Sequence, residues 1–211
     1  MERKIAMNPW LSIWTRPKET IRAIVDADPS YRFGWLAAIY GFSLLLEAAQ
    51  NFSLGDVLSP MMIVFFALIL SVFVGMLAIT VVSGLLFWTG RWVGGKATYK
   101  EIRSAVAWSN ITNVVSIISW FIMLCVFGRQ VFFSTFPQTT FAGYELGVVL
   151  ILFLAQVIVG IWSIVIIINA IAEVQRFSVW RALLNVIIPL VLIFIFTWIV
   201  GSIVIWSVKV S

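Results

Sequence analysis

PMMIVFFALILSVFVGMLAITVVSGLLFWT, residues 60–89, is the stretch that decides the fold, because it contains no charged side chain. A helix crosses the hydrocarbon core of a bilayer with about 20 apolar residues, each adding about 1.5 Å. This stretch is longer than that. We therefore predict a membrane-spanning helix that tilts, kinks or protrudes from the membrane.

Four further apolar stretches are also long enough to cross a bilayer. The five predicted spans lie at about residues 33–52, 60–89, 105–127, 146–172 and 183–206. The chain of 211 residues is 62% hydrophobic and only 11% charged, whereas a water-soluble domain carries about 25% charged residues. We predict an all-α integral membrane protein, with a five-helix transmembrane domain over residues 33–211. A cytoplasmic amphipathic segment, residues 1–32, precedes it.

Lysine and arginine are distributed unevenly over the predicted loops. Six lie in the first 32 residues, four between the second and third spans, and two between the fourth and fifth, and five spans place all of these on one side. Only Arg129 and Lys209 lie on the other side. Positive charge accumulates on cytoplasmic loops. We therefore predict a multi-pass protein of the cell membrane with its N-terminus in the cytoplasm and its C-terminus outside.

Two short helices are predicted before the first span. Asn8 and Pro9 form a helix start signal, because an Asn side chain caps free N–H groups and Pro suits the first turn. Pro17 starts a second helix, which carries Ile21 and Ile24 on the face opposite its charged residues. Such a basic amphipathic helix either lies in the membrane interface or packs as a cap on its own bundle, and the sequence leaves both open.

A helix start also precedes the third span. Thr98 and Glu101 have the spacing of a capping box, in which each side chain accepts from the backbone N–H of the other residue. We predict that this helix begins in the cytoplasm and runs into the span. Tryptophans near the expected span ends, among them Trp35, Trp108 and Trp180, are typical of an aromatic belt at the membrane surface.

Small residues recur along the second span. Ala67, Ser71, Gly75 and Ser83 fall close to one stripe, interrupted by Ile79. Such stripes let two helices approach closely. The pattern predicts helix packing inside the chain, with a seam between two copies as the alternative.

Glu47 is the one ionisable residue well inside a predicted span. Gln50 and Asn51 follow three and four residues later, so the three side chains share a helix face in the outer half of the first span. Ionisable groups inside a membrane are costly and often functional. The functional interpretation is a proton or cation site or a polar lining. The structural interpretation is a protonated or water-exposed carboxyl group that hydrogen-bonds another helix.

A second group of polar residues lies toward the cytoplasmic ends of the last three spans. These helix ends could converge into one polar cluster, formed by Asn110, Asn113, Asn169, Glu173 and Asn185. Interhelical amide hydrogen bonds would fix the packing there. The alternative is a pocket for a lipid headgroup or anionic ligand, with charge from nearby loops. The basic residues expected to supply it are Lys96, Arg103, Arg176 and Arg181.

The composition argues against several classes of protein. Histidine is absent and Cys125 is the single cysteine, so the chain lacks the commonest metal ligand and an activated nucleophile. We expect no enzymatic activity, no catalytic or metal site and no cofactor. The net charge of +5 follows from the membrane topology, so nucleic acid is not an expected partner. The expected partners are the bilayer, an anionic lipid and a second copy of the chain.

Three segments carry a family resemblance. They are NPWLSIWTRPKET at residues 8–20, GGKATYKE at residues 94–101, and the stretch from IWS at 161–163 through EVQRFSVWRA at 173–182. In their order and spacing they resemble the Yip-one (Ypt-interacting protein) domain family, in its bacterial branch of five-span proteins. The resemblance covers nearly the whole chain and implies the bacterial inner membrane.

The resemblance implies little about activity. Eukaryotic members of the family look like membrane factors of early secretory traffic that contact Rab-type GTPases through a cytosolic N-terminal region. Here that region has only about 32 residues, and the Asp-Leu-Tyr-Gly-Pro motif of the eukaryotic branch is missing. A GTPase partner is therefore not supported.

Two functions follow from these observations. The first is a non-enzymatic membrane protein that organises the membrane or partner proteins as a homo-oligomer, through its small-residue stripe and amphipathic helices. The second is a small transporter, channel or lipid-translocating protein that uses Glu47 and the intramembrane asparagines.

Overall fold

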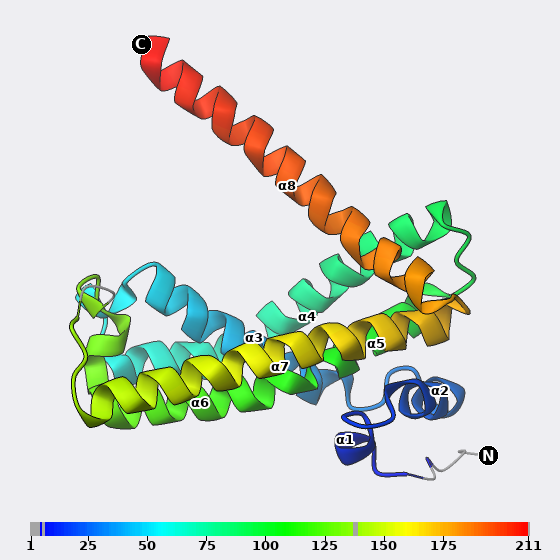
Figure 1. The fold of residues 1–211 in the computed structure, drawn as a ribbon, viewed down its shortest axis with the longest axis horizontal. Helices are drawn as coiled ribbons and strands as arrows, with labels where there is room; N and C mark the ends of the chain where they lie inside the picture. Colours follow the sequence, from blue (N-terminus) through cyan, green and yellow to red (C-terminus); the bar gives the residue numbers. More distant parts are fainter. Residues whose placement is uncertain (1–4, 6, 137–138, 211) are drawn as a thin grey trace.

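The computed structural model describes residue 5, residues 7–136 and residues 139–210, with side chains up to residue 202. It is all-helical (Figure 1). The α-helices are α1 (Pro9–Ser12), α2 (Pro17–Ala27), α3 (Phe33–Asn51), α4 (Pro60–Trp92), α5 (Tyr99–Ser109), α6 (Asn113–Phe127), α7 (Tyr144–Gln175) and α8 (Val179–Val210). Short 3-10 turns join some of them: η1 (Leu54–Asp56), η2 (Asn110–Thr112) and η3 (Gly128–Phe132).

Five helical segments are long and apolar enough to cross a membrane, which confirms the predicted fold class. They are Phe33–Asn51, Pro60–Trp92, Tyr99–Phe132, Tyr144–Gln175 and Val179–Ser202. Each contains or closely matches one predicted span. The second is a single α-helix of 33 residues, which is about 50 Å long at about 1.5 Å per residue. It and α7 are longer than the hydrocarbon core is thick, so each must tilt, bend or extend beyond it.

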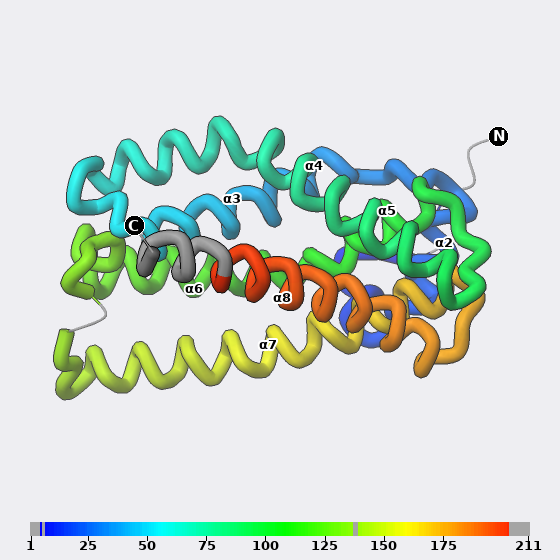
Figure 2. The backbone as a smooth tube through the Cα atoms, turned by 90° about the horizontal axis from the view of Figure 1, so that it is seen from above, coloured from blue at the N-terminus to red at the C-terminus, as the bar shows by residue number. Residues whose placement is uncertain are grey.

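The elements divide between two ends of the bundle (Figures 1 and 2). One end gathers α1, α2, α5, the α4–α5 loop and the turn between α7 and α8, and we call it the capped end. The α3–α4 and α6–α7 connections lie at the opposite end. The predicted basic loops all fall at the capped end, and Arg129 lies at the other. Which end faces the cytoplasm stays a prediction, and Arg3, Lys4 and the side chain of Lys209 lie outside the described parts.

Helix α5 forms the centre of the capped end. Every residue from Ser104 to Ser109 is buried, and α2, α3, α4 and α7 all contact the helix. The predicted capping box starts it: the Thr98 hydroxyl accepts from the Glu101 N–H, and Glu101 Oε2 accepts from the Thr98 N–H at 2.6 Å. This confirms a helix start well before α6, with a 3-10 turn at η2 between the two.

Trp108 is buried inside the capped end, so its assignment to a belt at the membrane surface was wrong. The Trp10 ring meets it edge-on at 5.3 Å between centroids, and the Tyr31 ring stacks on it at 6.2 Å. The reason is that α5 is enclosed by other helices. Trp35 and Trp180 are exposed at helix ends, where a belt residue would lie.

The two amphipathic helices pack on their own bundle. Asn8 Oδ1 accepts from the Trp10 N–H at 3.1 Å and caps α1, as predicted. Helix α2 begins at Pro17 and buries Ile21 and Ile24 completely, in contact with α5 and α7. Of the two interpretations left open by the sequence, the cap is the one this packing fits.

The small-residue stripe of α4 is used inside the chain. A Cβ atom added to Gly41 of α3 would meet the carbonyl oxygen of Ser71 and lie 2.6 Å from the amide nitrogen of Gly75. A Cβ added to Gly75 would lie 2.6 Å from the carbonyl carbon of Ala37. The two backbones therefore touch directly, and small residues on both helices are what allows it.

The remaining helices are packed much less tightly. Helix α7 lies beside α6 and reaches the capped end with its last turns (Figure 2). Helix α8 starts there against α4 and α7 and then leaves the bundle obliquely (Figure 1). Every residue of α8 from Leu190 to Val200 is exposed.

Candidate functional site

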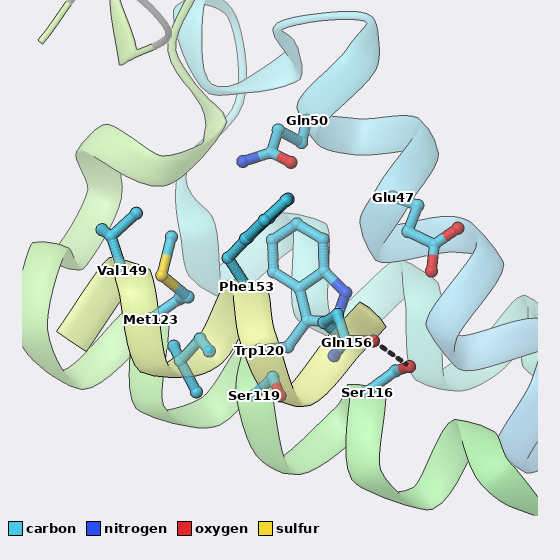
Figure 3. A pocket seen from close by; sticks show the side chains of 10 residues that line it. Glu47, Gln50, Ser116, Ser119, Trp120, Met123, Val149, Phe153 and Gln156 are labelled. Atoms are coloured by element: carbon cyan, nitrogen blue, oxygen red, sulfur yellow. Dashed lines mark hydrogen bonds between the residues drawn. The ribbon is translucent and has the colours of Figure 1, made fainter. Parts of the chain in front are cut away.

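A polar cleft lies between α3, α6 and α7, in the half of the bundle away from the capped end (Figure 3). Its volume is about 380 Å³. Polar and apolar side chains both line it: Glu47, Gln50, Ser116, Ser119, Trp120, Met123, Val149, Leu152, Phe153 and Gln156. Glu47 is the one charged residue among these lining residues.

Helix α3 supplies the acceptor side of the cleft. Ser43 lies one turn before Glu47 and donates to its Oε1 at 3.2 Å. The Gln50 amide nitrogen donates to the carbonyl oxygen of Val131 in η3 at 3.2 Å, so the Gln50 carbonyl oxygen faces the opposite way. Among the described residues no hydrogen bond reaches Glu47 Oε2 or Gln50 Oε1. Both oxygens are therefore available to a donor in the cleft.

Helices α6 and α7 supply the donor side. The Ser116 hydroxyl donates to Gln156 Oε1 at 3.1 Å, which joins the two helices (Figure 3). The Gln156 Nε2 hydrogens have no acceptor among the described residues. Trp120 stacks on Phe132, with 5.6 Å between ring centroids. Its indole nitrogen is turned toward the side of the cleft where Glu47 lies (Figure 3). An indole N–H can only donate.

On one side the cleft is lined by a side chain that also lies on the outer surface of the bundle. This is Phe153, which is 67% exposed. A molecule dissolved in the membrane can therefore reach the polar groups from the side. An amphiphile would place its polar part toward Glu47 and its chains along the apolar outer surface.

The structure brings together only part of the predicted outer polar group. Glu47 and Gln50 line the cleft, whereas Asn51 is exposed and does not. The sequence reasoning missed Ser116, Trp120 and Gln156. Gln156 was detectable, because it is a lone amide inside the long apolar run of the fourth span.

The asparagines of the second polar group make mostly local hydrogen bonds. Asn113 donates to the backbone carbonyl and to Oδ1 of Asn110, at 3.0 and 3.3 Å, so these two pair with each other. The Asn169 amide donates to the Val165 carbonyl of its own helix at 2.8 Å. Each amide thus satisfies itself locally, within a turn of its own position. Among the described residues, Asn110, Asn113 and Asn169 therefore make no side-chain hydrogen bond from one helix end to another, and a shared polar site at these ends stays a prediction.

Glu173 and Asn185 make contacts between elements, but separate ones. Glu173 forms an ion pair with Arg22 of α2. The buried Asn185 accepts through Oδ1 from the Thr89 hydroxyl at 2.8 Å, which joins α8 to α4. Gln175, which the sequence reasoning did not single out, is buried beside it and accepts from the Ala97 N–H at 3.2 Å.

The four basic candidates have different surroundings. Arg103 donates to the Ser30 hydroxyl at 3.4 Å, and its guanidinium lies 4.6 Å from the centre of the Phe33 ring. Arg176 lines a charged cleft of about 720 Å³ with Arg22, Asp26, Glu101 and Glu173. Lys96 and Arg181 are exposed. Both signs of charge mix in that cleft, so it is no simple anion site.

Metal coordination finds no support in the described part of the chain. There, no three or more His, Cys, Asp or Glu side chains are grouped so that they could hold a metal ion.

The five membrane-length helices define a multi-pass membrane protein of all-helical type, whose surroundings are a lipid bilayer. Residues 11–201 match the family described as Yip1 domain, and the chain belongs to the Yip1 domain family. The predicted family is thereby confirmed, while the bacterial branch stays a prediction. No curated protein and no solved structure is significantly similar to the chain.

Proposed function

We propose that this protein is a non-enzymatic membrane protein that binds a membrane lipid in the cleft between α3, α6 and α7, and so organises the lipid around it. The cleft is the observation that carries the proposal. It is a hollow of about 380 Å³ with an apolar lining and a few polar groups, in a bundle with many exposed apolar side chains. Ligand sites commonly have volumes of about 300–1,000 Å³ and combine an apolar lining with a few polar groups.

Two surfaces that could have bound a partner protein are occupied within the chain itself. The small-residue stripe of α4, with Ser71 and Gly75, is occupied by α3. The apolar face of α2, with Ile21 and Ile24, is occupied by α5 and α7. Neither surface is left free for a partner, whereas the cleft is.

The shape of the cleft also suits binding of a lipid better than conduction of an ion. Its described lining stops at Ser116 and Gln156 on the side of the capped end, and Asn110, Asn113 and Asn185 are not part of it. An ion would need polar groups across the whole hydrocarbon region, because an unpaired charge there is costly.

Lipid cross-linking tests the proposal. The protein is reconstituted in vesicles that contain a phospholipid with a photoreactive group next to its headgroup, and the labelled peptides are identified by mass spectrometry. We expect labelling around Trp120 and Met123 to exceed labelling around Phe194 and Phe196, which lie on the exposed part of α8 and do not line the cleft. Equal labelling of the two regions would overturn the proposal.

Substitutions sharpen the same experiment. Gln156→Leu removes the free donor and the hydrogen bond to Ser116, so labelling at Trp120 should decrease. Asn51→Leu is the matched control, because Asn51 lies one residue beyond Gln50 but outside the cleft. It should leave the labelling unchanged. A flux assay that compares the wild-type protein with Glu47→Gln tests the alternative function. Ion or proton flux in the wild type that this substitution abolishes would favour a transporter.

A second candidate function rests on α8. Its residues from Leu190 to Val200 are apolar apart from Thr197 and are exposed all round, so a helix of a second copy could pack there. A cysteine at Phe196, in a Cys125→Ser background, tests this homo-oligomer. Efficient disulfide dimers in the membrane would support it. Their absence, with efficient cross-linking of a control dimer, would count against it.

The predicted orientation belongs to this proposal too: the bacterial inner membrane, with the capped end in the cytoplasm. The gathering of basic segments at that end supports it, because such charge accumulates on the cytoplasmic side. A cysteine at the exposed Lys96, again in a Cys125→Ser background, should be protected from a membrane-impermeant thiol reagent added outside intact cells. Labelling without permeabilisation would overturn the orientation.

A further inference from the structure

The cleft separates hydrogen-bond acceptors from donors. On α3 the oxygens without a hydrogen bond from a described residue are Glu47 Oε2 and Gln50 Oε1, both acceptors. Gln50 Nε2 already gives one hydrogen to Val131 and keeps the other, so acceptors predominate on this helix. On α6 and α7 the corresponding groups are Trp120 Nε1 and Gln156 Nε2, both donors. A ligand that fits both sides must carry N–H donors at one end of its polar part and acceptor oxygens at the other.

The charge of the cleft narrows the ligand further. Among the described residues, Glu47 is the one ionisable group that lines the cleft, and no lysine or arginine lines it. A carboxylate in the hydrocarbon region is stabilised by a cation that also hydrogen-bonds it. A headgroup that is purely anionic would instead place like charges together. The basic residues that could hold such a headgroup, such as Arg103 and Arg176, lie at the capped end.

We infer that the cleft takes the headgroup of a zwitterionic phospholipid with a primary amine, the ethanolamine type. The ammonium group donates to Glu47 and Gln50, and the phosphate accepts from Trp120 and Gln156. The acyl chains leave past Phe153 into the bilayer. This inference rests on the proposed lipid-binding function and adds the chemistry of the headgroup.

The number of N–H donors is the decisive property. A primary ammonium has three N–H groups and can bind two acceptors at once, whereas a quaternary ammonium has none. Both carry the same charge and the same phosphate. A site that recognises only charge would bind the primary and the quaternary ammonium equally well. A site that recognises hydrogen-bond donors would bind the primary ammonium more tightly.

A methylation series tests this with the wild-type protein alone. The purified protein is reconstituted with phosphatidylethanolamine or with its mono-, di- and trimethylated forms, the last being phosphatidylcholine. Each competes for the photoreactive lipid that labels Trp120 and Met123. We expect competition to fall with each methyl group, by about tenfold or more over the series, because hydrogen bonds to charged groups are lost. Equal competition by all four lipids would overturn the inference.

The Glu47→Gln variant adds an independent readout. Glutamine replaces one carboxylate oxygen with an N–H donor and leaves only a neutral acceptor, so the hydrogen bonds from the primary ammonium weaken. The preference for the primary amine should therefore decrease, while the cleft still takes lipid. Asn51→Leu should keep the preference. Phosphatidylglycerol serves as the anionic lipid in the same assay. We expect it to compete poorly with the photoreactive lipid for the cleft. Stronger competition by phosphatidylglycerol than by phosphatidylethanolamine would overturn the inference.

The two proposals fail in different ways. Cleft labelling that no headgroup change affects removes the headgroup inference and leaves lipid binding intact. Cleft labelling no stronger than that of α8, for every lipid tested, removes both.

Discussion

The capped end and helix α8 differ in how much of their side chains they bury. In α5 every residue from Ser104 to Ser109 is buried, whereas in α8 every residue from Leu190 to Val200 is exposed. Yet α8 is by far the more hydrophobic of the two, since α5 contains Lys100, Glu101 and Arg103. Hydrophobicity therefore tells which solvent surrounds a helix, lipid or water, and not how many neighbours it has. In water an apolar side chain is driven into a core, and in lipid no such force acts between helices.

Small residues explain how α5 is enclosed on all sides. Ser104, Ala105, Ala107 and Ser109 let neighbouring helices come close around Trp108, the one large side chain at their centre. The same device holds α3 against α4 in the membrane. Where small residues are missing, as along α8 from Leu190 to Val200, the helix stands apart. This difference can be tested by substitutions of decreasing severity.

Gly41→Leu should have the largest effect. The added side chain would meet the backbone of Ser71 and Gly75, which cannot move aside without separating α3 from α4. We expect little monodisperse protein after extraction in mild detergent, measured by size-exclusion chromatography. Gly84→Leu on α4 is the matched control, because a Cβ there meets nothing within 4 Å. A normal elution profile for Gly41→Leu would show that the close α3–α4 seam is dispensable.

Trp108→Ala should destabilise the protein strongly, by about 3–5 kcal/mol, the usual cost of emptying a buried aromatic site. The loss also removes the contacts with Trp10 and Tyr31. The measurement is the thermal unfolding midpoint in detergent. Trp198→Ala, on the exposed part of α8, removes the same side chain where only lipid or detergent surrounds it, so it should shift the midpoint little. Equal shifts would mean that α8 is covered in solution.

How far the sequence predicts this molecule depends on whether a feature is local. The five spans, the capping box of Thr98 and Glu101 and the helix start at Pro17 follow from neighbouring residues, and all are found. The cleft depends on α3, α6 and α7 lying side by side. Nothing near Glu47 in the sequence indicates that Gln156 would face it.

The asparagines also show that contacts between helices are hard to predict from the sequence. Asn110, Asn169 and Asn185 were grouped because they lie at a similar depth in the membrane. Depth determines how far along the membrane normal a side chain lies. The direction in which it leaves its helix determines which neighbours it can contact. Asn169 instead bonds its own helix, and Asn185 bonds Thr89. A pattern along one chain therefore predicts the depth of a polar group better than its partner.

Gln175→Leu should have an intermediate effect. Gln175 accepts from the Ala97 N–H and lies buried against Gly90 and Gly95. Leucine fills similar space but leaves the Ala97 N–H without a partner, which costs about 1–3 kcal/mol. We expect a lower unfolding midpoint than for Asn169→Leu, the control on the same helix, whose amide bonds only its own backbone. The opposite order would place the stabilising polar contacts elsewhere.

Separating Arg22 from Glu173 should have the smallest effect, although this ion pair joins α2 to α7. The Arg22 side chain is 68% exposed and that of Glu173 is 16% exposed, so water screens the attraction. A double-mutant cycle with Arg22→Ala and Glu173→Ala should give a coupling of about 0.2–1 kcal/mol, and less at high salt. The Arg16–Glu19 pair, at 3.9 Å within one turn, is the control, and its coupling should also be small. A coupling of several kcal/mol between Arg22 and Glu173 would mean that charge, and not the buried face of Ile21 and Ile24, holds α2 on the bundle. The capped end would then no longer resemble a water-soluble core.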